Sequence, residues 1–174
     1  MSEKETKFHR AFGVYGLYFK DGKLLVINKN GGPYINRFDL PGGSLEESES
    51  LTNAMKREFL EETGFEIEVV KNLGVIDFML PWDWEQYSHV HHIAVYYLVD
   101  RIGGQIVIPK QFDGQDSLGA FWVSESEVNL NNASPLVLKA FEWLKKGDLG
   151  LDVECYEHWG VKNNVVKLTD SILQ

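Results

Sequence analysis

The feature that most constrains this chain is a glycine-rich turn that leads directly into a helix, within residues 40–65 (LPGGSLEESESLTNAMKREFLEETGF). The Pro-Gly-Gly run ends any preceding strand. Ser48 or Ser50 is placed to cap the first turn of the helix, and Gly64 to close its last turn in a left-handed conformation. No proline interrupts Ser50–Thr63, so we expect a helix there.

The faces of this helix differ from those of a purely structural helix. At about 100° per residue, Leu51, Ala54 and Met55 form an apolar stripe that should face the core. Glu58 and Glu62 fall on the same side of the helix as this stripe. Two carboxylates are therefore expected to point toward the core.

Such an arrangement has a cost. Like charges four residues apart oppose helix formation by about 0.2–0.5 kcal/mol, and partial burial adds a larger desolvation term. Partial protonation, neutralisation by Arg57 or a divalent cation would each offset this cost. The alternative is that the glutamates extend into solvent, as on most glutamate-rich helices. Oxygen ligands without cysteine favour Mg²⁺ or Mn²⁺ over zinc.

The spacing of these residues resembles the Nudix box, GX5EX7REUXEEXGU, where U is a bulky apolar residue. Gly43 is followed after five residues by Glu49 and after seven more by Arg57-Glu58, and every fixed position is filled up to Phe65. The resemblance implies an α/β protein with the Nudix fold, an α/β/α sandwich with a mixed sheet. It also implies hydrolysis of a diphosphate bond in a nucleoside diphosphate linked to another moiety, and an ion pair between Glu49 and Arg57.

The resemblance assigns site roles only to residues of the motif. It implies that Glu58, Glu61 and Glu62 bind Mg²⁺, with Mn²⁺ as a substitute, together with the backbone carbonyl of Gly43. The cation would lower the pKa of an attacking water and neutralise charge on the phosphoryl oxygens. Glu61 or Glu62 would also serve as the catalytic base.

Further candidates lie outside the motif. Asp116 precedes a predicted strand containing Trp122, where many Nudix hydrolases carry another catalytic carboxylate; a solvated loop aspartate is the alternative. Arg37 is a candidate substrate contact because a guanidinium matches phosphate oxygens, although surface ion pairing is the commoner role. Trp82 and Trp84 are expected either to stack on a planar group of the substrate or to anchor an apolar interface such as a homodimer.

The substrate has two interpretations. Pro81 follows Phe65 by 16 positions, a spacing similar to one in ADP-ribose pyrophosphatases, so an ADP-ribose-like compound is one expectation and a nucleoside triphosphate is the other. A non-catalytic nucleotide sensor on the same fold is the alternative to an enzyme, and the intact motif argues against it. Isomerisation of isopentenyl diphosphate would need Cys155, the only cysteine, which lies outside the motif.

Composition bounds the class of protein. The 174 residues, 44% hydrophobic and 25% charged, suit one soluble domain. We expect a Nudix domain in residues 1–147 and a C-terminal extension, residues 148–174, packed on the same domain. The net charge of −9 argues against a nucleic-acid partner. A single cysteine, no signal peptide and no long apolar run predict a cytoplasmic protein without a disulfide or a membrane span.

Apolar runs predict the remaining elements. Asp21-Gly22 predicts a hairpin of two antiparallel strands, Phe8–Phe19 and Leu24–Ile27. Ser134, Pro135 and Gly147 predict a second helix over residues 135–146, which should cover the other face of the sheet. Further strands are expected at residues 66–80 (one strand, or two joined at Gly74), 91–99, 120–123, 153–156 and 161–168, with an edge hairpin at 102–108 and a helical turn at 125–130.

The strand at residues 91–99 is nearly continuously apolar, which predicts burial on both of its faces. His89, His91 and His92 lie at its start. Because side chains alternate along a strand, we expect these histidines to divide between the two faces, with one packed inward and one in solvent.

Overall fold

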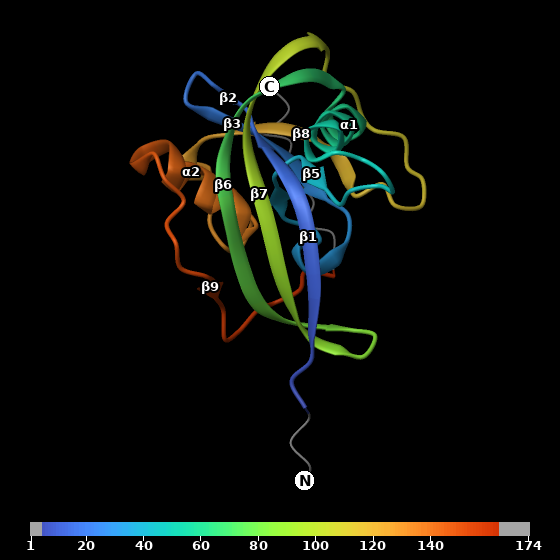
Figure 1. The fold of residues 1–174 in the computed structure, drawn as a ribbon, viewed down its shortest axis with the longest axis vertical. Coiled ribbons are helices and arrows are strands. Elements are labelled where there is room, and N and C mark those ends of the chain that lie inside the picture. The colour runs from blue at the N-terminus through green and yellow to red at the C-terminus, as the bar shows by residue number, and fades with distance from the viewer. Residues whose placement is uncertain (1–4, 164–174) are drawn as a thin grey trace.

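The computed structural model describes residues 5–163. Its elements, in chain order, are β1 (Phe8–Leu17), β2 (Phe19–Lys20), β3 (Lys23–Lys29), the 3₁₀ turn η1 (Gly32–Tyr34), β4 (Phe38–Asp39), β5 (Gly42–Gly43), α1 (Leu51–Thr63), β6 (Phe65–Trp84), β7 (Tyr87–Gly104), β8 (Ser117–Val123), η2 (Glu125–Glu127), α2 (Pro135–Lys146) and β9 (Glu154–Cys155). The strands form two sheets (Figure 1): β5-β1-β7-β6-β9, and β2-β3-β4 with β8 paired to β3.

The two helices pack against opposite faces of the sheets. Val14 of β1 and Val95 of β7 share a buried cluster with Phe59 of α1. Tyr96, the next residue of β7, belongs to a second cluster with Leu136 of α2. Because successive side chains of a strand point to opposite faces, this division defines an α/β/α sandwich. β1 and β7 are parallel while β6 and β7 are antiparallel, so the sheet is mixed and the predicted fold class is confirmed.

Both predicted helices are confirmed. Ser50 caps α1, its Oγ accepting the Asn53 N–H at 3.2 Å, and Gly64 ends the helix at φ 85°. α2 has the predicted bounds. The expected apolar stripe of α1 was wrong at Leu51, which is 36% exposed, because the buried contacts of the helix begin at Ala54.

The predicted hairpin at the N-terminus was wrong in extent. Of the predicted first strand, only the short segment β2 pairs antiparallel with β3, across the turn at Asp21 and Gly22. β1 pairs instead in parallel with β7, from Phe8 opposite His89 to Leu17 opposite Leu98. The local turn residues fix a hairpin, but they carry no information about a partner strand so distant in sequence.

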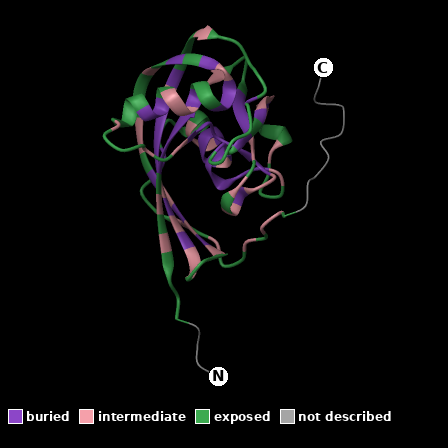
Figure 2. Cartoon of the chain, turned by 90° about the vertical axis from the view of Figure 1, so that its right-hand side faces the viewer, coloured by how far each residue is buried: buried purple, intermediate pink, exposed green. Residues whose placement is uncertain are grey.

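The strands after the motif are longer than predicted. Residues 66–80 form part of one continuous strand, β6, and residues 91–99 form part of β7; residues 94–97 of β7 are buried on both faces. The predicted edge hairpin at 102–108 was wrong, because β7 runs to Gly104, which pairs with Phe65, and residues 105–110 form no strand. Figure 2 shows buried residues concentrated between the helices, while the far end of these long strands is more exposed.

The last predicted elements are short or incomplete. β8 begins at Ser117, earlier than predicted, and η2 is a single turn. β9 lies inside the predicted strand at 153–156 and pairs in parallel with β6. The strand predicted at 161–168 lies partly outside the described residues, and residues 161–163 are not in a strand.

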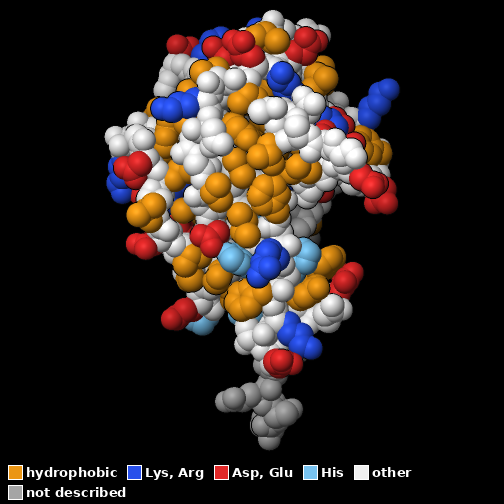
Figure 3. Space-filling view, in the orientation of Figure 1, with side chains coloured by type: hydrophobic (Ala, Val, Ile, Leu, Met, Phe, Trp, Pro, Cys, Tyr) orange, Lys and Arg blue, Asp and Glu red, His pale blue; other side chains and the backbone are white. Residues whose placement is uncertain are grey.

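One face of the first sheet carries apolar side chains toward solvent. Hydrophobic side chains gather over the middle of the view in Figure 3, where β6, β7 and β1 lie in front. β1 contributes Phe12, 41% exposed, and β6 contributes Val75, 57% exposed. No helix within residues 5–163 combines the length and hydropathy needed to cross a bilayer.

Candidate active site

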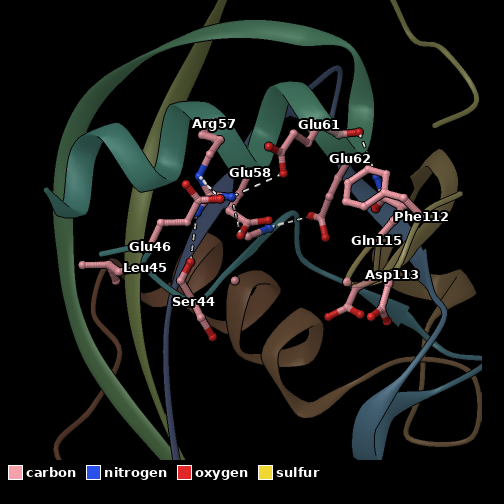
Figure 4. A pocket seen from close by; sticks show the side chains of 14 residues that line it. Ser44, Leu45, Glu46, Arg57, Glu58, Glu61, Glu62, Phe112, Asp113 and Gln115 are labelled. Carbon is pink, nitrogen blue, oxygen red and sulfur yellow. Dashed lines mark hydrogen bonds and ion pairs between the residues drawn. The ribbon is translucent and has the colours of Figure 1, made fainter. Parts of the chain in front are cut away.

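The motif helix and two loops enclose a cavity of about 330 Å³, which we call the acidic cavity (Figure 4). Its walls are the turn at residues 42–46, the face of α1 that carries Arg57 and the glutamates, and the loop at residues 112–116. Figure 4 shows Glu58, Glu61 and Glu62 projecting from α1 toward the space between the two loops. The cavity therefore collects carboxylates from the helix predicted to carry them.

Arg57 fixes the geometry of this wall. Its Nε and Nη2 donate to Glu49 Oε1 at 2.7 Å and to Oε2 at 2.9 Å, and Nη2 also donates to the Ser44 carbonyl at 3.0 Å. Nη1 reaches Glu58 at 2.9 Å and Glu61 at 3.3 Å. The hydrogen bond from Arg57 lowers the pKa of Glu49 to about 2. The ion pair between Glu49 and Arg57 joins the turn to the helix, as the resemblance implied.

Two glycines let the carboxylates lie against the backbone. Gly42 has φ 149°, and a Cβ there would collide with the Val14 carbonyl; its N–H donates to Glu62 Oε2 at 2.8 Å. At Gly43 a Cβ would lie 2.9 Å from Glu58 Oε1. A side chain at position 43 would therefore occupy the space that the Glu58 carboxylate uses, whereas one at position 42 would collide with the backbone of β1.

The site concentrates negative charge in a partly dehydrated place. Burial raises the pKa of Glu62 well above its usual value, against the opposing effect of Lys29. Burial also raises the pKa of Glu58, while the hydrogen bond from Arg57 opposes it. Burial alone would lower the pKa of Lys29, but the neighbouring carboxylates, Glu62 first, raise it. Lys29 Nζ donates to Asp116 Oδ2 at 2.9 Å, so the site contains a positively charged side chain among its carboxylates.

The donors fit a divalent cation such as Mg²⁺. They are carboxylate oxygens and the backbone of Gly43, the hard ligands that Mg²⁺ prefers, and the missing Cβ of Gly43 keeps the approach to Glu58 open. Within the described residues, no three acidic, histidine or cysteine side chains already form a complete metal cluster. Arg57 holds Glu58 and Glu61, and the Gly42 N–H holds Glu62.

The structure brings the predicted metal-binding and catalytic residues together in one cavity. The acidic cavity is lined by all the predicted metal ligands and by the predicted loop carboxylate: Gly43, Glu58, Glu61, Glu62 and Asp116. Glu62 is buried at 2% exposure, whereas Glu61 remains accessible with 40% of its side chain exposed. Asp116 also lines a second, smaller cavity of about 160 Å³, so the two cavities adjoin there.

The predicted substrate contacts divide between different places. Trp82 lines the second cavity. Trp84 stacks on Trp82, with ring centroids 5.5 Å apart and planes at 2°, and lies outside the cavity lining. The Arg37 guanidinium packs over the ring of Trp159 at 4.3 Å, and its Nε donates to the Leu130 carbonyl at 3.0 Å. Arg37 therefore meets the C-terminal segment rather than the lining of either cavity.

Some residues of the site were not anticipated from the sequence. Asp39 is buried in the second cavity and accepts hydrogen bonds from Ser134 Oγ at 2.6 Å and from the Leu40 N–H at 2.9 Å; burial raises its pKa. The sequence signal for Asp39 was a charged residue placed directly before an apolar, glycine-rich turn. The comparable signal for Lys29 was a charged residue at the end of an apolar strand.

The histidines divide between the two faces as predicted. His92 is buried on the side of the second cavity, whereas His91 lies on the other face, where its Nε2 is 2.7 Å from Asp77 Oδ2.

Comparison with known proteins identifies the family. The family model of the NUDIX domain matches residues 7–145, most of the chain, and the chain therefore belongs to the NUDIX domain family.

Two curated relatives illustrate the range of its similarities. The ADP-ribose pyrophosphatase of Methanocaldococcus jannaschii is 38% identical over 98 residues, covering 56% of this chain and 55% of the relative. The 8-oxo-dGDP phosphatase NUDT18 of Danio rerio is 27% identical over 129 residues, covering 74% of this chain and 34% of the relative. The alignments thus span 55% and 34% of the relatives' own lengths.

Solved structures agree on the fold. A NUDIX hydrolase from Nitrosomonas europaea superposes with a TM-score of 0.58 at 19% identity, covering 90% of this chain and 82% of the other. A MutT NUDIX hydrolase from Burkholderia pseudomallei gives a TM-score of 0.58 at 22% identity, covering 77% and 97%. At these identities the likeness concerns the fold alone.

Proposed function

We propose that this protein is a Mg²⁺-dependent hydrolase that cleaves a diphosphate bond in a nucleoside diphosphate linked to another moiety. The observation that carries the proposal is the convergence of Glu58, Glu61, Glu62 and Gly43 on one cavity. A cation bound there would polarise the phosphoryl oxygens and make an attacking water acidic at neutral pH.

The residues of the chain then have separate tasks. Arg57 positions Glu58 through the hydrogen bond at 2.9 Å. Glu61 is the most exposed of the three glutamates, and we assign to its carboxylate the acceptance of the proton from water. Asp116, held by Lys29, stands at the junction of the two cavities, where it can orient the group that leaves.

The favoured substrate is an ADP-ribose-like compound, with a nucleoside triphosphate as the second candidate. An ADP-ribose pyrophosphatase is among the relatives of the chain. The aromatic ring of Trp82 in the second cavity supports a planar group on the substrate. We also propose that residues 148–163 form one unit with the domain, because β9 pairs with β6.

A panel assay tests this function. Purified protein is incubated with Mg²⁺ or Mn²⁺ and with ADP-ribose, nucleoside triphosphates, dinucleoside polyphosphates and nucleotide sugars, and products are separated by chromatography. The expected result is metal-dependent conversion of ADP-ribose to AMP and ribose 5-phosphate. Nucleotide binding without product from any compound in the panel would overturn the proposal in favour of a sensor.

A further inference from the structure

The second cavity contains a hydrogen-bonded trio that the acidic cavity does not require. Tyr15 of β1, Tyr34 of η1 and His92 of β7 line this cavity and are 7%, 2% and 6% exposed. The Tyr15 hydroxyl lies 2.8 Å from His92 Nε2, and the Tyr34 hydroxyl lies 3.1 Å from His92 Nδ1. Both ring nitrogens of one histidine therefore have a tyrosine hydroxyl as partner.

The trio is held from several directions. Glycine at position 13 makes room for the Tyr15 ring, since a Cβ there would lie 2.7 Å from the Tyr15 hydroxyl oxygen. Trp159 meets the Tyr34 ring edge-on at 5.8 Å and donates its Nε1–H to the Pro33 carbonyl at 2.8 Å. Trp159 lies beyond residue 145, where the match to the family ends. The C-terminal segment of this chain thus supports a wall of the cavity.

The protonation state of His92 determines which hydrogen bonds the trio can offer to a ligand. Burial, followed by Lys29 and His91, lowers the pKa of His92 to about 3, so its ring is neutral at pH 7. A neutral imidazole has one N–H donor and one bare nitrogen. One tyrosine must donate to the bare nitrogen, whereas the other accepts the ring N–H and keeps its own proton for an outside acceptor. A change of tautomer exchanges these two roles.

Within residues 5–163, neither tyrosine hydroxyl has a hydrogen-bond partner other than His92. The trio therefore offers one free donor and one free acceptor, and either hydroxyl can take either role. The rest of the cavity favours a flat and uncharged group. Trp82 and His9 provide aromatic walls, Asp39 disfavours an anion, and the charge of Lys29 is already matched by Asp116.

We propose that the trio is a specificity-determining contact for a neutral heteroaromatic base, and that it accepts an oxo or an amino substituent at the contacted position. An oxo group accepts a hydrogen bond from the tyrosine whose O–H is free. An amino group donates a hydrogen bond to the oxygen of the tyrosine whose O–H is already donated to His92. The inference rests on the proposed function for its choice of ligand, a nucleoside.

Equilibrium binding tests the inference without hydrolysis. Adenosine and inosine differ in having an amino or an oxo group on the same ring position, and ribose 5-phosphate lacks the base. Each is titrated calorimetrically into the full-length protein in EDTA. Adenosine and inosine should bind with dissociation constants within about threefold of each other, and more tightly than ribose 5-phosphate. A difference above about thirtyfold between the two nucleosides, or no preference over ribose 5-phosphate, would overturn the inference.

Variants separate the trio from the general shape of the cavity. His92→Phe and Tyr34→Phe should each raise the dissociation constants of both nucleosides at least tenfold, which corresponds to about 1.4 kcal/mol. The matched control is Trp143→Phe, outside the cavity lining, which should change neither. Tyr34→Phe keeps the ring, so it remains informative if His92→Phe does not fold. Unchanged nucleoside binding in the folded variants would contradict the inference.

The binding titrations contain EDTA and no divalent cation, so their result does not depend on hydrolysis. The binding experiment and the panel assay can therefore fail independently. A panel without products would overturn the proposed function and leave the binding result standing. If the protein hydrolyses nucleotides but the trio variants bind nucleosides as tightly as the unmodified protein, the inference alone is overturned.

Discussion

Gly43→Ala should slow catalysis while leaving the fold intact. A Cβ at this position would lie 2.9 Å from Glu58 Oε1 and 3.1 Å from its carboxyl carbon, whereas ordinary contacts begin at 3.4 Å. The Glu58 carboxylate must therefore move, and reaching an ordinary contact requires a shift of 0.5 Å, the difference between 3.4 and 2.9 Å. Gly43 does not have a positive φ, so alanine introduces no backbone strain.

The expected effect follows from the sensitivity of catalysis to geometry. A misplacement of about 1 Å can cost about 100-fold in rate, so a shift of half that size should cost roughly 10-fold or more in kcat/KM. The substrate is ADP-ribose with Mg²⁺, and turnover is followed by chromatography of AMP. Thermal unfolding should stay within about 2 °C of the unmodified protein.

The control is Gly160→Ala. Gly160 also lacks a positive φ, and a Cβ there meets no atom within 4 Å. This variant should keep both the activity and the unfolding temperature. Full activity of Gly43→Ala, or an equal loss in Gly160→Ala, would refute the argument from the crowding of Glu58.

Three further predictions follow from the same contacts. Arg57→Lys keeps the charge but loses the paired hydrogen bonds to Glu49, so kcat should fall about 10-fold or more in a folded protein; unchanged kcat would contradict this. Phe59→Ala, at a fully buried position, should lower the free energy of unfolding in urea by about 3–5 kcal/mol, and a loss below about 1 kcal/mol would contradict close packing. Burial lowers the pKa of His92 to about 3 in the folded protein, whereas in the unfolded chain it is about 6.5. As the pH falls below about 6.5, the unfolded chain therefore binds a proton that the folded protein does not, and the free energy of unfolding decreases. Between pH 7 and pH 5 the protein should lose about 2 kcal/mol more than His92→Phe in urea titrations, and equal losses would contradict a neutral, buried ring.

Local signals in the sequence were sufficient for the helices and the acidic wall. Ser50 and Gly64 mark the ends of α1 because capping depends on a few neighbouring residues. The spacing from Glu58 to Glu62 fixes one face of a helix, so the gathering of these carboxylates followed directly from it.

Features that depend on distant segments could not be obtained in this way. Phe8 pairs with His89, and no local turn residue encodes a parallel partner so far along the chain. The Arg37 guanidinium packs on Trp159, so its side chain was predicted from its chemistry alone and placed elsewhere by tertiary contacts. The trio joins Tyr15, Tyr34 and His92 from three separate segments, and the alternation of side chains along a strand predicts only that the neighbouring histidines lie on opposite faces.

The most direct test of the central claim is the turnover of ADP-ribose by Glu61→Gln with saturating Mg²⁺, measured beside Glu68→Gln. The first change removes a carboxylate that lines the acidic cavity, and the second removes an exposed carboxylate on β6. A general base typically contributes about 10²- to 10⁴-fold, so Glu61→Gln should lose at least about 100-fold in kcat while remaining folded, and Glu68→Gln should keep its activity. Near-normal turnover by Glu61→Gln would contradict the claim that this cavity performs the hydrolysis.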